Sequence, residues 1–137
     1  DDNLMYLSNL AEELELKICD KNIYITHSLP NDCSSYVYDL KDFDKKFLSK
    51  YDYYCFGHTH IPIISYQYGT CIINSGSVGQ PRDYTQKPSF AVVDLKDDSV
   101  ILKKVDIDYT QYCKRLNDIS YSESLIKILK RGKNEKD

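Results

Sequence analysis

Residues 55–62 read Cys-Phe-Gly-His-Thr-His-Ile-Pro, in which an apolar stretch turns at once into a glycine, two histidines and a proline. Residues 23–30 and 72–79 have the same form, an apolar strand followed by polar, turn-forming side chains. Ligands of open α/β sheets bind beyond the carboxyl ends of the strands, where loops converge and backbone groups are free. These segments therefore predict one binding edge, and the three histidines of the protein, His27, His58 and His60, all lie on it.

Around this edge, the chain has the composition of one globular domain. Its 137 residues are 42% hydrophobic, 28% charged and 12% aromatic, which excludes a fibrous or wholly disordered protein. Apolar spacing predicts helices at 4–13, 39–50, 109–117 and 122–131, the last ended by Gly132, and strands at 15–19, 22–26, 53–56, 63–68, 71–74, 90–95 and 100–107. This pattern predicts an α/β fold in which some strands that are adjacent in sequence pair antiparallel.

Charge and cysteine content limit the partners and the compartment. The net charge of −3 gives no reason to expect a nucleic-acid polymer as partner, and no apolar run approaches the roughly 18 residues of a membrane span. The five cysteines include no C-x-x-C pair, which favours free thiols in a reducing compartment, the cytoplasm. Cys55 precedes His58 by three residues, as in half of a zinc finger, but no second pair follows. We therefore expect Cys55 and Cys71 to pack in the core.

The grouping of the histidines predicts metal binding. A single histidine after a strand is more often a hydrogen-bonded core or loop residue than a metal ligand. In a regular strand, His58 and His60 would share a face about 7 Å apart, which suits two adjacent ions, about 3.5–4 Å apart, better than one ion. Gly57 would then let the backbone approach an ion closely or adopt a positive φ.

Three motifs together resemble those of a known family. Thr26-His27, Gly57-His58-Thr59-His60 and the run Asn-Ser-Gly-Ser-Val-Gly-Gln-Pro-Arg-Asp at 74–83 are similar to motifs of the calcineurin-like metallophosphoesterases. The resemblance is strongest to the small prokaryotic branch of YfcE-type phosphodiesterases and diadenosine tetraphosphatase-like proteins. It implies a four-layer α-β-β-α sandwich with mixed sheets. Residues 1–137 would be the C-terminal portion of a single such domain, because the family's Asp-x-His, Gly-Asp and Asn-His motifs do not occur in them.

The same resemblance implies roles for individual residues. His27 and His58 would hold the second of two divalent ions and His60 the first, the metals being Mn, Ni, Zn or Fe. The residues implied to line the substrate cleft are Asn74, Ser77, Gln80 and Arg82, the last through its planar fork of donors. Ser28 and Ser75 stand where the family usually has glycine and proline, and Ser28 could alter how closely the substrate or the backbone approaches the metal.

Acidic ligands are scarce in this stretch. Two divalent ions carry four positive charges, which neutral imidazoles do not offset. Asp32 and Asp52 stand in ordinary turn contexts, and Asp83 could pair with Arg82 or hold its own loop, so none of the three is assigned to metal. With all three histidines already given to the ions, no residue is a candidate general acid.

The resemblance implies a phosphoric ester hydrolase, a phosphodiesterase or phosphatase. Such an enzyme would hydrolyse a small phosphoester, such as a nucleotide, through a metal-bound hydroxide in the intact protein, while this chain alone would be inactive. One alternative is a non-catalytic scaffold or binding module, similar to the metallophosphoesterase-like subunit of retromer. Another is that the histidines bind metal only weakly. Uncovered strand edges predict that the isolated chain forms homo-oligomers.

Overall fold

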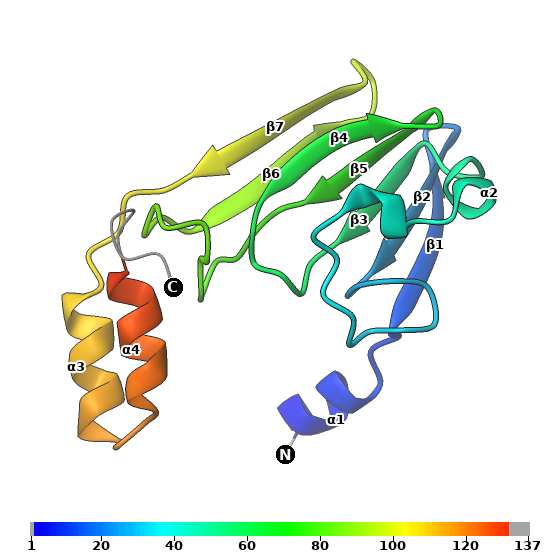
Figure 1. Ribbon diagram of the computed structural model, residues 1–137. Coiled ribbons are helices and arrows are strands. Elements are labelled where there is room, and N and C mark those ends of the chain that lie inside the picture. The colour runs from blue at the N-terminus through cyan, green and yellow to red at the C-terminus, as the bar shows by residue number, and fades with distance from the viewer. Residues whose placement is uncertain (1, 132–137) are drawn as a thin grey trace.

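The computed structural model describes residues 2–131, which form a five-stranded sheet in the order β1-β2-β3-β5-β4 and a two-stranded sheet of β6 and β7 (Figure 1). The strands are β1 (Glu13–Ile18), β2 (Lys21–Thr26), β3 (Tyr53–Phe56), β4 (Ile63–Gln67), β5 (Thr70–Asn74), β6 (Ser89–Asp94) and β7 (Ser99–Lys104). The helices are α1 (Asp2–Ser8), α2 (Lys45–Leu48), α3 (Thr110–Asp118) and α4 (Glu123–Lys130), with a short 3₁₀ turn at Leu40–Asp42.

The centre of the large sheet is parallel. Strands β2, β3 and β5 run side by side in the same direction, while β1 and β4 pair antiparallel at the two edges. The register places Ile25 opposite Cys55, and Phe56 opposite Asn74. The carboxyl ends of the three central strands therefore lie together, and the predicted shared edge is present.

Both faces of the central strands are buried, which explains why these strands are apolar throughout rather than alternating. On one face, Tyr24, Tyr54 and Ile72 pack against Phe43 and Leu48 from the segment that contains α2. On the other face, a cluster of Ile23, Tyr53, Cys71 and Ile73 packs against the β6-β7 hairpin. The described residues thus form three layers: the α2 segment, the five-stranded sheet and the hairpin.

The predicted mixed α/β fold with a mixed sheet is confirmed. The outer face of the hairpin carries Phe90, Val92 and Ile101, which are all exposed. Helices α3 and α4 pack on each other through Cys113 and Leu129 and extend beyond the end of the hairpin rather than over it (Figure 1).

Two predicted helices are wrong in extent. The helix expected at 4–13 ends at Ser8, and its leucines are exposed, because residues 13–18 pair with all six residues of β2 instead. The helix expected at 39–50 is split into the 3₁₀ turn and the single-turn α2. Each of these two helical turns has its own N-cap: the Asp39 side chain accepts from the backbone N–H of Lys41, and the Asp44 side chain accepts from that of Phe47.

The remaining elements fall within a few residues of their predicted places. The predicted end of the last helix, at Gly132, lies outside the described residues. Cys71 is buried and Cys55 half-buried beneath the hairpin, which confirms their core role, and burial raises the pKa of the Cys55 thiol to about 11. Within residues 2–131, no helix has the length and apolarity needed to cross a membrane.

Candidate metal centre

The first feature of the site is its unusual backbone. Strand β3 ends at Phe56, and the N–H of Gly57 donates to the carbonyl oxygen of His27 at 3.0 Å, which ties the ends of β2 and β3 together. Positive φ values fall on His58 (60°) and His60 (59°), not on Gly57. The chain thus turns tightly directly after β3, so a regular strand does not continue through both histidines, and of the two alternatives expected for Gly57 the positive φ is not found.

His27 and His58 are brought into direct contact. His27 Nε2 lies 2.8 Å from His58 Nδ1, and the two rings meet edge to face with centroids 4.8 Å apart. Two nitrogens that bind the same ion, each at about 2.1 Å and with the two metal–nitrogen bonds at right angles, lie about 3 Å apart. The observed spacing therefore fits a shared ion. The same contact also serves as an imidazole–imidazole hydrogen bond, and His58 Nε2 is buried with no partner.

His60 is held separately. Its Nδ1 lies 2.9 Å from the carbonyl oxygen of Gln80, which accepts the Nδ1 proton and leaves Nε2 with a free lone pair. Burial lowers the pKa of His60, and the nearby charges of Arg82, His58 and His27 lower it further, against the opposing effect of the Gln80 hydrogen bond. A neutral imidazole with Nε2 free is the form that binds a metal.

The acidic side chains do not complete the site. Among residues 2–131, no group of three or more histidine, cysteine or acidic side chains is arranged to hold an ion. Asp32 accepts hydrogen bonds from Ser34 and Ser35, which lower its pKa to about 2, and Asp52 accepts from the backbone of Asn22. Asp83 binds Lys104 and Thr85, and so holds its own loop. The donor atoms at the site therefore fit metal ligands of the imidazole type, without a carboxylate.

Asn74 joins the two loops of the site. It has no exposed surface, and its Nδ2 donates to the carbonyl oxygen of Gly57 at 2.8 Å and to Thr59 Oγ1 at 3.0 Å. Its Oδ1 accepts from the N–H of Gly76 at 2.9 Å. The amide thus fixes the histidine loop against the 74–83 loop. The sequence motif placed Asn74 at the site without indicating this use of its side chain.

The rest of the 74–83 loop is internally bonded. Ser77 Oγ accepts from the N–H of Gln80 at 2.9 Å, and Gln80 Oε1 accepts from Arg82 Nη2 at 3.2 Å. The Nε atom of Arg82 is buried and has no hydrogen-bond partner. The loop therefore holds the Arg82 guanidinium near His60, with one N–H group that makes no hydrogen bond.

Sequence reasoning missed the aromatic residues at the site. Ser28 is fully buried, its hydroxyl donates to the carbonyl oxygen of Ser35, and its carbonyl accepts from Tyr54 at 2.8 Å. These bonds hold the following loop so that the Tyr36 ring lies on His58, with centroids 4.1 Å apart. The Tyr-Val-Tyr alternation at 36–38 was the only available signal.

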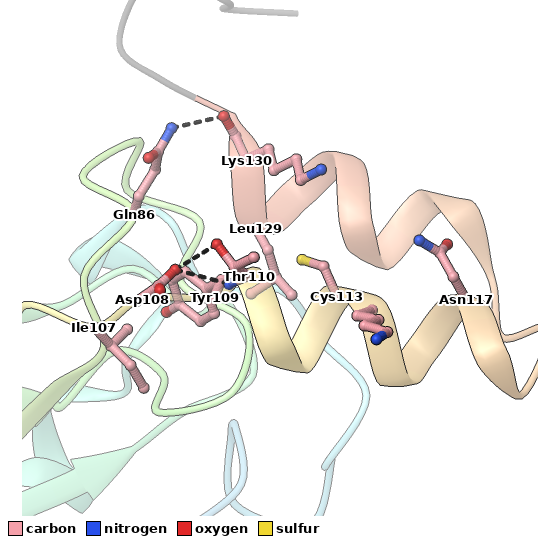
Figure 2. A pocket seen from close by; sticks show the side chains of 10 residues that line it. Gln86, Ile107, Asp108, Tyr109, Thr110, Cys113, Asn117, Leu129 and Lys130 are labelled. Atoms are coloured by element: carbon pink, nitrogen blue, oxygen red, sulfur yellow. Dashed lines mark hydrogen bonds between the residues drawn. The ribbon is translucent and has the colours of Figure 1, made fainter.

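A separate hollow of about 510 Å³ lies where α3 and α4 join the body, lined by Gln86, Tyr109, Cys113 and Leu129 among others (Figure 2). Gln86 Nε2 donates to the carbonyl oxygen of Lys130 across its mouth at 2.6 Å. None of the residues that line this hollow is a histidine, so it is distinct from the candidate metal centre.

Several known proteins resemble this chain in sequence or in fold. An uncharacterized protein of Methanocaldococcus jannaschii is 28% identical over 123 residues, which cover 79% of this chain and 51% of that protein. A hypothetical protein of Pyrococcus horikoshii superposes with a TM-score of 0.82 at 21% identity, over 96% of this chain and 54% of the other. A metallophosphoesterase of Sphaerobacter thermophilus gives 0.78 at 22% identity, over 96% and 61%. The chain thus spans about half the length of these relatives.

More distant structures of the same fold differ in kind. They include an archaeal phosphodiesterase, with a TM-score of 0.52 at 19% identity over 69% of this chain and 51% of the other. They also include a zinc complex of Vps29 from Entamoeba histolytica, with a TM-score of 0.50 at 21% identity over 73% and 63%. Residues 2–98 match the calcineurin-like phosphoesterase superfamily domain. By this match, which covers most of its length, the chain belongs to the calcineurin-like phosphoesterase superfamily.

Proposed function

We propose that this chain carries the histidine side of a two-metal site that hydrolyses a small phosphoester, such as a nucleotide. The observation that carries the proposal is the 2.8 Å approach of His27 Nε2 and His58 Nδ1 at the carboxyl ends of two parallel strands. Membership of a phosphoesterase superfamily supports it. The proposal includes the finer assignment to the YfcE and diadenosine tetraphosphatase-like branch, in a cytoplasmic setting that suits five free thiols.

The histidines and the loop would divide the work. His27 and His58 would share one ion and His60, oriented by Gln80, would reach the other. Divalent ions, with manganese the first to test, activate water and offset negative charge on phosphoryl oxygens. The Arg82 guanidinium would then donate to a phosphoryl oxygen.

The other loop residues would support that contact. Ser77 and Gln80 bond to the loop and to Arg82, so they would position the guanidinium while facing the substrate. Asn74 is fully buried, and we assign it the positioning of both loops. This chain would be the C-terminal portion of a larger catalytic domain, whose other residues would supply the carboxylate ligands and a general acid. The chain alone would therefore be inactive.

Metal binding tests the site directly. Calorimetric titration of the chain with Mn²⁺ should give a dissociation constant that rises about tenfold or more in His27→Ala, because one of two shared nitrogens is lost. Asp108→Asn, which changes an exposed turn carboxylate far from the histidines, is the control and should leave the constant unchanged.

Activity tests the reaction. The full-length gene product should hydrolyse a chromogenic phosphodiester only with a divalent metal, and His27→Ala should abolish this turnover. Metal binding indifferent to His27→Ala, together with no metal-dependent turnover, would refute the proposal.

A second candidate function is a non-catalytic binding module of the same fold. One observation favours it, the exposed apolar row of Leu14, Leu16 and Ile18 on β1, which continues the face that the hairpin covers elsewhere. A scaffold would bind a partner protein through this row, and Leu16→Lys would then abolish partner binding while the metal titration stayed unchanged. Metal-dependent turnover by the full-length product would decide against it.

A further inference from the structure

The loop after β2 presents two tyrosines beside the histidine pair. The rings of Tyr36 and Tyr38 are nearly parallel, with an interplanar angle of 11° and centroids 6.0 Å apart, and the Tyr36 ring also contacts that of His58 at a tilt of 48°. About half of Tyr36 and about two thirds of Tyr38 are exposed. Tyr36 therefore contacts the candidate metal centre, and Tyr38 continues an exposed aromatic surface beside it.

The tyrosine pair is held in place by its neighbours. Val37, between the two tyrosines, is 5% exposed and belongs to the core cluster under α2, so the extended backbone sends both neighbouring rings outward on the same side. The Asp32 carboxylate accepts hydrogen bonds from Ser34 and Ser35, and the backbone of Asp32 pairs with that of Leu29. The segment that leads into the tyrosines is therefore preorganised, and little ordering entropy remains to be lost when a ligand stacks on them.

We propose that Tyr36 and Tyr38 form a stacking platform for the flat organic group of the substrate, so that the phosphoester is a nucleotide or a similar aromatic ester. This inference rests on the proposed function and narrows its substrate class. A phosphate held at the histidines would have its organic part beside Tyr36, and a nucleobase there would stack on the exposed tyrosine rings. Stacking of a base on tyrosine does not depend on which base is present or on charge. It therefore suits a site whose ionic groups already bind the phosphate.

The experiment compares a nucleotide with ligands that lack the base, or both the base and the sugar. The full-length gene product, with Mn²⁺ present, is titrated with AMP, ribose 5-phosphate and inorganic phosphate by calorimetry, and Tyr38 ring resonances are followed by NMR. AMP should bind about tenfold more tightly than ribose 5-phosphate, equivalent to about 1.4 kcal/mol. It should also shift the Tyr38 ring resonances, whereas ribose 5-phosphate should not.

Three variants locate the effect. Tyr38→Leu should remove the preference for AMP while leaving ribose 5-phosphate binding unchanged, and Tyr38→Phe should keep the preference, because the ring and not the hydroxyl is used. Tyr121→Leu is the matched control, since Tyr121 is also about half exposed but lies at the turn before α4. Because Tyr38 is mostly exposed, Tyr38→Leu should fold normally, which its circular dichroism and melting temperature check.

The outcomes separate this inference from the proposed function. Equal binding of AMP and ribose 5-phosphate, or a preference for AMP that survives in Tyr38→Leu, overturns the platform while leaving the phosphate site intact. The platform would then be a surface for contact with another protein. If none of the three phosphate compounds binds in the presence of metal, the proposed function fails and the platform fails with it.

Discussion

Replacing Asn74 should separate the two loops of the site and destabilise the whole chain. Asn74→Ala removes three hydrogen bonds and leaves the part-buried N–H of Gly76 without a partner, while the Gly57 carbonyl keeps its bond from the Thr59 N–H. Each lost bond of this kind costs about 1 kcal/mol, and a buried group left unpaired costs more, so the expected loss is about 3–4 kcal/mol. That is a large fraction of the roughly 5–15 kcal/mol that stabilises a typical domain.

Urea denaturation followed by circular dichroism measures this loss. With a slope of about 1.5 kcal/mol per molar urea, the unfolding midpoint should fall by about 2–2.7 M, whereas the exposed-residue control Asn117→Ala should move it little. Asn74→Asp refines the test, because at neutral pH its carboxylate faces the Gly57 carbonyl that the amide used to donate to.

The pH dependence of Asn74→Asp has a defined sign. Repulsion in the folded state raises the pKa of the new carboxyl above its unfolded value of about 3.9. Its protonated form can donate to Gly57, so the deficit relative to the wild-type chain should be smaller at pH 4 than at pH 7. An Asn74→Ala midpoint within about 0.3 M of wild type, or an Asn74→Asp deficit independent of pH, would refute this account of the junction.

Three further predictions concern other parts of the chain. Gly76 has a φ of 81° and a Cβ there would lie 2.1 Å from Ser89 Oγ, so Gly76→Ala should lower unfolding free energy by about 3 kcal/mol in the same assay, while Gly79→Ala, with open space around it, should not. Burial raises the pKa of Asp83, but hydrogen bonds from Lys104 and Thr85 outweigh this effect and hold the pKa below 3.8. The stability that these bonds give is present above pH 3.8 and is lost as the pH falls through the folded-state pKa, so the stability deficit of Lys104→Met should shrink between pH 5 and pH 2. A deficit that stays constant over this range would count against the pair. The exposed β1 row should make the isolated chain self-associate in sedimentation, and Leu16→Lys should shift it toward monomer; a wild-type monomer at all concentrations would contradict this.

The parts of the fold that sequence could predict are those with strong local signals. The central strands are apolar on both faces and end in polar turns, so both their existence and their shared edge followed from the pattern. Tertiary strand pairing shortened the first helix, because residues 13–18 pair with β2 along their whole length. The 39–50 segment has helical spacing, but Asp39 and Asp44 offer two competing caps, and spacing alone does not register this competition.

The candidate site shows the same division. The contact of His27 with His58 follows from two parallel neighbouring strands that each end just before a histidine. The place of Tyr36 depends on how an irregular loop crosses back over β3, which no periodicity encodes. The bonding of Asn74 depends on three atoms from two loops, so it could be read only from coordinates.

The left-handed backbone at His58 and His60 affects how this site can be dissected and how it could evolve. Most side chains resist that conformation, whereas glycine and asparagine adopt it readily. An alanine at either position would therefore combine loss of the imidazole with a strained turn, and a weakened protein could be mistaken for a weakened metal site. His58→Asn or His58→Gly removes the imidazole while relieving the turn, so the loss of its contacts with His27 and Tyr36 is measured without added backbone strain. Comparing these variants with alanine therefore separates the loss of the ligand from the strain of the turn, a conformation that also occurs outside the site, at Tyr68 and Gln86.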